Sequence, residues 1–245
     1  MARIFITGSA DGLGQLSAKA LLEMGHSVVL HARNAVRAED ALKKNRDAET
    51  VLTGDLSDIE ETKMLAAEVN KLGHFDAVIH NAGLYRAPAK EVFYVNTLAP
   101  YILTCLVQKP KRLIYLSSGM HYQGYPKLEY FEKNSDRITY SDTKLHVVML
   151  CGAIARKWKG VYANAVDPGW VPTKMGGRGA PDNLKKGYET QVWLAVSNDE
   201  RAKVSGRYFF HQTERRHHPE GDRIDLQNKF LDLCEEVTGV PFPGS

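Results

Sequence analysis

The residues best suited to chemistry in this sequence are a tyrosine and a lysine four positions apart. Tyr140 and Lys144 stand in the stretch YSDTK, at the start of a helix expected over 140–158. Residues at i and i+4 share a helix face, so the ammonium group should lie beside the phenol. A nearby positive charge lowers a tyrosine pKa, and such a phenol can exchange a proton with a developing alkoxide. A half-buried aromatic beside a solvated lysine is the alternative for an isolated pair.

A serine and an asparagine could complete this set. Ser118 ends a strand expected over 112–118, where its hydroxyl could hydrogen-bond a substrate carbonyl beside Tyr140. Asn96 lies within a helix expected over 91–108, although asparagine is only a modest helix former. A functional role for Asn96 and a solvent-facing side chain both remain open at this point.

A glycine-rich stretch near the N-terminus, ITGSADGLGQ, has the composition of a phosphate-binding loop. Glycine tolerates positive φ and close backbone approach, and a helix N-terminus offers unpaired N–H groups to an anion. A strand expected over 3–7 precedes the stretch and a helix over 14–24 follows it, which favours a nucleotide site over a simple turn. The predicted contacts are Gly8, Ser9, Ala10, Asp11, Gly12, Leu13 and Gly14.

The end of the strand expected over 27–31 indicates which dinucleotide binds. An acidic residue is typical of NAD sites at this point, but here Ala32 is followed by Arg33. An arginine can bind a 2′-phosphate through charge-assisted hydrogen bonds. The sequence therefore predicts NADP in preference to NAD. The alternative is a solvated basic face that continues through Lys43, Lys44 and Arg46.

These groups must be positioned by alternating strands and helices. Expected strands cover 3–7, 27–31, 49–53, 76–80, 112–118, 161–166 and 206–210. Alternation with helices predicts one doubly wound α/β Rossmann domain over 1–245, with a seven-stranded parallel sheet flanked by helices. Ligands of such sheets bind at the carboxyl ends of the strands. The candidates there include Asp55, Leu56, Asn81, Ala82, Gly83, Pro168 and Gly169.

Composition limits the remaining classes of protein. A net charge of +3 over 245 residues is too small to indicate nucleic-acid binding. No apolar run is long enough to span a bilayer, and the N-terminus lacks the features of a signal peptide. Three distant cysteines are typical of a reducing cytoplasm, and the histidines over 211–218 lack metal-ligand spacing. We therefore expect a cytoplasmic protein that binds no nucleic acid, membrane or metal.

Taken together, the motifs resemble those of the short-chain dehydrogenase/reductases. TGSADGLG, GDL, HNAG, VFYVNTLAP, LSS, YSDTK and DPGWVPT occur in that family's order over about 3–175. The aromatic insertion before Tyr140 and the late GRYFF are similar to the branch of the retinol dehydrogenases and the WW-domain-containing oxidoreductase, which tends to use NADP. Two features depart from the pattern: Asp11 stands where NADP users often have a basic residue, and the gap from Gly83 to Asn96 is short.

The resemblance implies hydride transfer between a nicotinamide cofactor and a small-molecule carbonyl or alcohol. In that scheme Tyr140 is the acid/base, and Lys144 holds the nicotinamide ribose and lowers the pKa of the tyrosine. Ser118 polarises the carbonyl, and Asn96 positions a water that relays protons to Lys144. Thr173 binds the carboxamide. The further cofactor contacts in DPGWVPT are Pro168, Gly169 and Val171.

Two alternatives would use the same fold differently. A regulatory protein that senses the nucleotide without turnover would not need Tyr140 and Lys144, and a sugar-nucleotide epimerase or dehydratase would have a longer C-terminal part. The Gly- and Lys-rich segment over 174–190 is expected to be a mobile substrate lid. The helices over 91–108 and 140–158 resemble those that pair in homodimers and homotetramers of the family.

Overall fold

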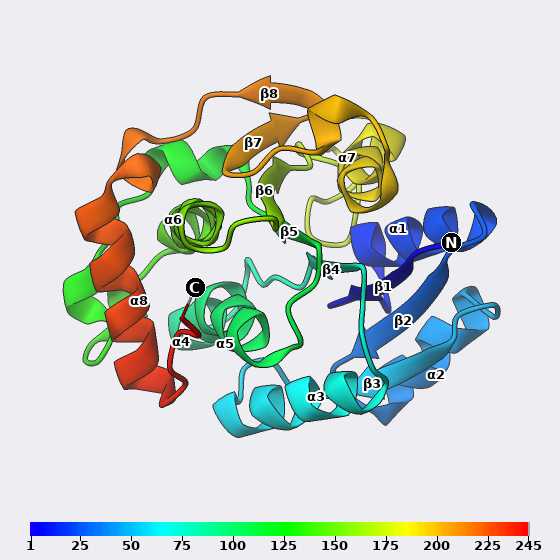
Figure 1. Cartoon of the computed structure of the whole chain (residues 1–245), viewed down its shortest axis with the longest axis horizontal. Coiled ribbons are helices and arrows are strands. Elements are labelled where there is room, and N and C mark those ends of the chain that lie inside the picture. Colours follow the sequence, from blue (N-terminus) through cyan, green and yellow to red (C-terminus); the bar gives the residue numbers. More distant parts are fainter. Residues whose placement is uncertain (245) are drawn as a thin grey trace.

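A sheet of eight strands runs through the protein in the order β3-β2-β1-β4-β5-β6-β7-β8 (Figure 1). The computed structural model describes residues 1–244. Seven strands are parallel: β1 (Arg3–Ile6), β2 (Ser27–Ala32), β3 (Thr50–Thr53), β4 (Ala77–His80), β5 (Arg112–Leu116), β6 (Tyr162–Asp167) and β7 (Arg207–Phe210). The strand order reverses between β1 and β4, so the predicted doubly wound Rossmann arrangement is confirmed.

The eighth strand, β8 (Thr213–Arg215), forms an antiparallel edge that the sequence did not predict. It pairs with β7 through a turn in which His211 and Gln212 both have positive φ, the backbone of a tight hairpin. Asparagine or glycine usually occupies such a turn, and neither does so here. The predicted count of seven strands is therefore one too low.

Helices cover both faces of the sheet (Figure 1). In β1, Ile4 and Ile6 point into one apolar core and Phe5 into the other, because successive strand residues face opposite sides. The first core lies under α1 (Gly12–Glu23), α2 (Ala35–Lys44) and α7 (Leu184–Val196), and the second under α3 (Ile59–Lys71), α4 (Ala89–Phe93), α5 (Ala99–Leu106), α6 (Tyr140–Lys157) and α8 (Ile224–Thr238). None of the helices within residues 1–244 combines the length and apolar character needed to cross a membrane.

The helix expected over 91–108 is interrupted near its middle. α4 passes into a π-helical turn at Tyr94–Leu98 before α5 begins, and Asn96 lies at the centre of that turn. Pro100 stands in the first turn of α5 and has no N–H to donate to the carbonyls of the π-helical turn before it. The irregularity therefore precedes the proline and includes the asparagine.

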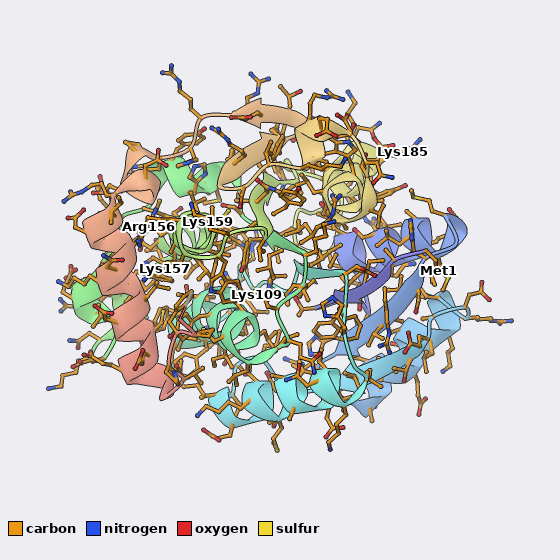
Figure 2. All side chains as sticks on the ribbon, viewed as in Figure 1. Met1, Lys109, Arg156, Lys157, Lys159 and Lys185 are labelled. Atoms are coloured by element: carbon orange, nitrogen blue, oxygen red, sulfur yellow. The ribbon has the colours of Figure 1, made fainter. Side chains whose placement is uncertain are left out.

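The helix that begins with Tyr140 is enclosed by its own chain. Every residue of α6 from Ser141 to Cys151 is buried, and α8 lies on the side of α6 opposite the sheet (Figure 1). Arg156, at the basic end of α6, is labelled between α6 and α8 in Figure 2. It donates hydrogen bonds to Gln227 and Asn228 of α8. The side of α6 that faces away from the sheet is therefore occupied by α8.

Candidate active site

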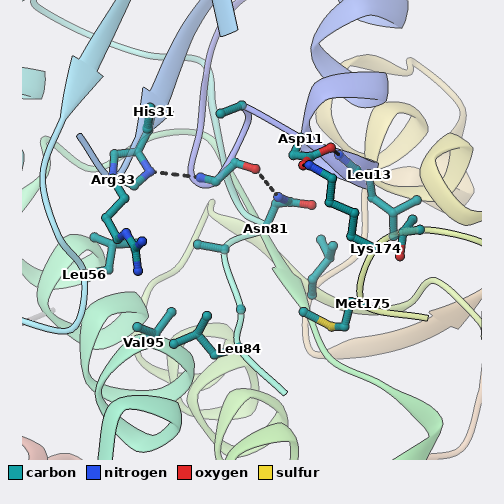
Figure 3. A pocket seen from close by; sticks show the side chains of 18 of the residues that line it. Asp11, Leu13, His31, Arg33, Leu56, Asn81, Leu84, Val95, Lys174 and Met175 are labelled. Atoms are coloured by element: carbon teal, nitrogen blue, oxygen red, sulfur yellow. Dashed lines mark hydrogen bonds and ion pairs between the residues drawn. The ribbon is translucent and has the colours of Figure 1, made fainter. Parts of the chain in front are cut away.

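A cavity of about 390 Å³ opens at the carboxyl ends of β1 and β4, where the strand order reverses (Figure 3). Doubly wound sheets bind their ligands at this place. The predicted site residues that line it are Gly8, Ala10, Asp11, Gly12, Leu13, Arg33, Asp55, Leu56, Asn81, Ala82, Gly83, Tyr140, Lys144, Pro168 and Thr173. The others lie behind or beside that lining: Ser9, Gly14, Asn96, Ser118, Gly169 and Val171.

His31, near the end of β2, fixes the start of the glycine loop (Figure 3). The Gly8 N–H donates to His31 Nδ1 at 2.9 Å, so Nε2 carries the proton and donates to the Gly54 carbonyl, also at 2.9 Å. Burial lowers the pKa of His31 to about 4, which keeps the ring neutral at pH 7. The Ser9 N–H donates to the His31 carbonyl at 3.0 Å. The first two N–H groups of the loop are therefore used within the protein.

An anion in the cavity can still meet the N–H groups that follow Gly12 in the first turn of α1, since Asp11 already accepts from the Gly12 N–H. The first turn of a helix has no intrahelical acceptor for its N–H groups and carries partial positive charge. Gly12, the first residue of α1, has a φ of +54°. A Cβ at Gly12 would lie 3.9 Å from the Thr173 side chain, so the helix start and Thr173 form two sides of a narrow gap.

Asn81 locks the glycine loop to the end of β4. Its amide Nδ2 donates to the carbonyls of Thr7 at 3.0 Å and of Gly8 at 3.1 Å. A Cβ at Gly14 would lie 2.3 Å from this nitrogen and 2.6 Å from the Gly8 carbonyl oxygen. Gly14 is therefore required by the packing of the loop, and it lies behind the cavity lining.

Asp11 caps α1 and joins three segments. Its Oδ1 accepts from the Gly12 N–H at 2.8 Å, and its Oδ2 pairs with Arg37 at 3.2 Å and Lys174 at 2.5 Å. Burial opposes ionisation, but the hydrogen bonds from Lys174, Gly12 and Arg37 outweigh it and lower the pKa of Asp11 to about 2. The carboxylate thus ties the glycine loop to α2 and to the segment after Thr173.

The two arginines near the end of β2 have different surroundings. Arg37 on α2 pairs with both Asp11 and Asp40, at 3.2 and 3.6 Å. Arg33 is exposed at the rim of the cavity and forms no ion pair with any residue of the described chain (Figure 3). Arg33 is therefore the free cation on this side of the cavity.

Tyr140 and Lys144 reach the inner end of the cavity from the first turns of α6. Thr139 and Asp142 form a capping box that sets the start of this helix. Lys144 Nζ lies 5.4 Å from the centre of the Tyr140 ring and donates to the Leu116 carbonyl at 2.8 Å. Burial lowers the pKa of Lys144 to about 8. The expected proximity of the two side chains is present.

The pKa of Tyr140 departs from its ordinary value in the direction opposite to the expected one. Burial raises it to about 12; the hydrogen bond with Ser118 lowers it, and Asp167 adds to the rise. Burial disfavours the phenolate more than the hydrogen bond with Ser118 favours it. The Tyr140 side chain is therefore a neutral phenol at neutral pH.

The two serines at the end of β5 have separate tasks. The Ser117 hydroxyl donates to the Lys144 carbonyl at 2.9 Å, so it joins β5 to α6. Ser118 lies one residue further, accepts from the Met120 N–H at 3.2 Å and interacts with Tyr140. Ser118 is the serine whose hydroxyl is adjacent to the phenol.

The amide of Asn96 connects the loop after β4 to α6. Its Oδ1 accepts from the Leu84 N–H at 2.8 Å, and its Nδ2 donates to the Leu84 carbonyl at 2.9 Å and to Thr143 at 3.1 Å. Asn96 is 1 % exposed, so the solvent-facing alternative is wrong. A Cβ at Gly83 would lie 3.4 Å from both Asn96 Oδ1 and Lys144 Nζ, so both groups lie close to this glycine.

The irregular segment after β6 is shorter than the lid that was expected over 174–190. Residues from Leu184 onward form α7, which packs on α1 and is anchored by a Gln191–Ser17 hydrogen bond of 3.1 Å. The irregular part ends at Asn183, the N-cap of α7. Of the predicted contacts here, Val171 is 4 % exposed and packs near Gly187, so its side chain serves the fold.

Among the residues of this site that sequence reasoning missed are His31 and Lys174. A histidine inside the apolar strand SVVLHA was the only signal for His31. The Lys174–Asp11 pair joins residues 163 positions apart, and nothing local predicts it. Within residues 1–244, no group of three or more His, Cys, Asp or Glu side chains is placed to hold a metal ion.

Comparison with known proteins agrees with this geometry. A sequence model described as "short chain dehydrogenase" matches residues 2–118. An uncharacterised oxidoreductase of Emericella nidulans is 49% identical over the full length of both chains, and a short-chain dehydrogenase of Penicillium rubens is 41% identical over 99% of this chain and 100% of its own. The chain belongs to the short-chain dehydrogenase family.

More distant relatives of this short-chain dehydrogenase extend the comparison. Mouse retinol dehydrogenase 14 is 26% identical over 97% of this chain and 86% of its own. A crystal structure of an uncharacterised Mycobacterium paratuberculosis protein superposes with a TM-score of 0.83 at 21% identity, covering 99% of this chain and 95% of that one. A Shigella flexneri short chain dehydrogenase complexed with NADP gives 0.68 at 21% identity, over 86% and 97%. These two structures share the fold of the chain. The family model and the relatives of 41–49% identity show that this short-chain dehydrogenase is an oxidoreductase.

Proposed function

We propose that this short-chain dehydrogenase transfers a hydride between NADP(H) and a small carbonyl or alcohol substrate, with Tyr140 as acid and base. The proposal is carried by the neutral phenol of Tyr140, which is half-buried and lies beside Ser118 and Lys144 in a cavity of about 390 Å³. A regulatory nucleotide sensor would gain nothing from placing these groups together. Turnover of NADPH with a panel of aldehydes, ketones and quinones tests the proposal, and no turnover with any member would count against it.

The cavity fits a nicotinamide dinucleotide. The free N–H groups of α1 suit the pyrophosphate, and Asp55 at the end of β3 suits the adenine amino group. The cofactor would supply the hydride. Pro168 and Thr173 would contact its nicotinamide end, since they line the same cavity as Tyr140 and Lys144.

Each polar group near Tyr140 has a separate task in the proposed reaction. The Ser118 hydroxyl donates a hydrogen bond to the substrate carbonyl oxygen, which stabilises negative charge as the alkoxide forms. Tyr140 gives its phenolic proton to that oxygen, and in the reverse direction takes it back. Lys144 holds the nicotinamide ribose, and its ammonium group stabilises the phenolate that remains after proton transfer. Asn96 keeps the Leu84 loop in place and positions the water through which Lys144 exchanges protons.

Arg33 supports the choice of NADP. Its guanidinium is free at the cavity rim, whereas Arg37 is already paired with Asp11 and Asp40. The Shigella neighbour is described as a complex with NADP, and a blue fluorescent protein of similar fold, with a TM-score of 0.71, as a complex with NADPH. We infer that Arg33 binds the 2′-phosphate, and that Asp11 keeps Arg37 directed toward α1.

We expect Arg33→Ala to raise the Kd for NADPH about 10- to 100-fold and to leave the Kd for NADH within about twofold. The reason is the loss of a charge-assisted hydrogen bond to a phosphate that only NADPH carries. Fluorescence titration of both cofactors measures the two constants. Lys43→Ala is the matched control, because Lys43 is an exposed cation on α2 outside the cavity lining. Equal changes for both cofactors would contradict the assignment of Arg33.

The pH dependence should differ between the two directions. Burial raises the pKa of Tyr140 to about 12, so the phenol is protonated throughout the neutral range. Carbonyl reduction uses the protonated phenol and the Lys144 ammonium, whose pKa is about 8, so its kcat should stay flat between about pH 5 and 7. Alcohol oxidation uses the phenolate, and its kcat should rise by up to about tenfold per pH unit over the same range. Saturating kinetics in both directions measure this, and a reduction rate that falls with pH within this range would contradict it.

A further inference from the structure

His121 lies three residues after Ser118, outside the cavity lining. It belongs to the 3₁₀ turn Gly119–Gln123, for which Ser118 is the N-cap. The imidazole is 0% exposed, and its ring packs on those of Tyr122 and Tyr208, with ring centres 4.1 and 4.6 Å apart. A polar ring this deeply buried needs a partner for each nitrogen.

Both nitrogens of His121 have backbone partners. The N–H of His218 donates to His121 Nε2 at 3.2 Å, so Nε2 carries no proton. The proton is therefore on Nδ1, which donates to the Ser118 carbonyl at 2.7 Å. Burial lowers the pKa of His121 to about 4, so the ring keeps this neutral form at physiological pH. One side chain thus bridges Ser118 and the segment that leads to α8.

The neighbouring residue makes a parallel connection. The Tyr122 hydroxyl donates to the Arg216 carbonyl. Two adjacent side chains of the 3₁₀ turn are therefore bonded to the backbone of 216–218. Of the two, only His121 also bonds to Ser118, so it alone links the position of the serine to this distant segment.

We propose that His121 is a positioning residue that holds the Ser118 hydroxyl beside Tyr140 by fixing the Ser118 backbone to His218. The inference rests on the proposed roles of Ser118 and Tyr140. A carbonyl held between these two hydroxyls reacts fast only if both are placed within a fraction of an ångström. The hydrogen bond from His121 Nδ1 restrains Ser118, whose hydroxyl must be placed with this accuracy.

The test is a double-mutant cycle between His121 and Ser118. His121→Phe keeps an aromatic ring against Tyr122 and Tyr208 and the bond from the His121 N–H to the Ser118 carbonyl (3.0 Å), but it removes both hydrogen bonds of the imidazole. We expect it to lower kcat about 10-fold or more while the Kd for NADPH stays within about twofold. His121→Asn, whose amide can still donate to the Ser118 carbonyl, should recover most of that loss. Tyr122→Phe, which leaves the bond to Ser118 intact, should have the smaller effect.

In a Ser118→Ala background, His121→Phe should cause no further loss of kcat, because the hydroxyl that it positions is gone. The same fold-loss in both backgrounds would overturn the role of His121 and leave the proposed function intact. Full activity of Ser118→Ala alone would overturn the proposed role of Ser118 and this inference with it. Nitrogen NMR of the unmodified enzyme gives a check that needs no variant: a protonated Nδ1 on His121 is expected, and a protonated Nε2 would overturn the inference.

Discussion

Tyr140→Phe should lower kcat by about two to four orders of magnitude while the Kd for NADPH stays within about twofold. The substitution removes one oxygen atom, and that oxygen carries the proton that the alkoxide must receive. The ring itself is retained, so its packing against Tyr85, with ring centres 4.8 Å apart, should persist. Single-turnover kinetics separate the chemical step from binding, and fluorescence titration gives the Kd.

Tyr130→Phe is the control for this deletion, because it removes the same oxygen from a 3₁₀ turn away from the cavity. It should change neither kcat nor the Kd. Retained turnover in Tyr140→Phe would show that the proton comes from another group. A lost affinity for NADPH at unchanged kcat would instead make Tyr140 a binding residue.

Gly14→Ala should cost about 1–3 kcal/mol of unfolding free energy, lowering Tm by roughly 3–10 °C, and should weaken NADPH binding more than 10-fold. The new methyl group would lie 2.3 Å from Asn81 Nδ2 and 2.6 Å from the Gly8 carbonyl oxygen. Neither atom can move away easily, because Asn81 Nδ2 is hydrogen-bonded to the carbonyls of both Thr7 and Gly8. The loop must move as a unit, and the cofactor site moves with it.

Calorimetry and cofactor titration measure the two effects of Gly14→Ala. Gly244→Ala is a suitable control, because a Cβ there would have no heavy atom within 4 Å. An unchanged Tm for Gly14→Ala would mean that the Asn81 amide is not fixed as described. A lower Tm with unchanged affinity would mean that the loop does not contribute to cofactor binding.

The alternation of apolar runs was sufficient to predict the parallel sheet, because each buried strand is flanked by glycines and a helical pattern. The hairpin to β8 could not be predicted, since His211 and Gln212 adopt positive φ without the residues that normally favour it. The π-helical turn around Asn96 is likewise set by tertiary contacts with Leu84 and Thr143. Local sequence carries little information about either feature.

Within the site, the proximity of several groups could be predicted and their energetics could not. The spacing of Tyr140 and Lys144 predicts their proximity, but the pKa of Tyr140 depends on burial by segments far along the chain. Asp11 was the odd residue of the glycine loop, and it proves to be a helix cap. Its pairs with Arg37 and Lys174 join parts of the chain that no local pattern connects.

The enclosure of α6 by α8 also determines when the enzyme can form during synthesis. The helix that begins with Tyr140 is covered by a helix whose first residue, Ile224, follows 84 positions later. A ribosome that has exposed every predicted catalytic residue therefore still carries a chain whose α6 is not yet covered by α8. Synthesis supplies the predicted catalytic groups early, and the side of α6 that faces away from the sheet is covered only after α8 has been made.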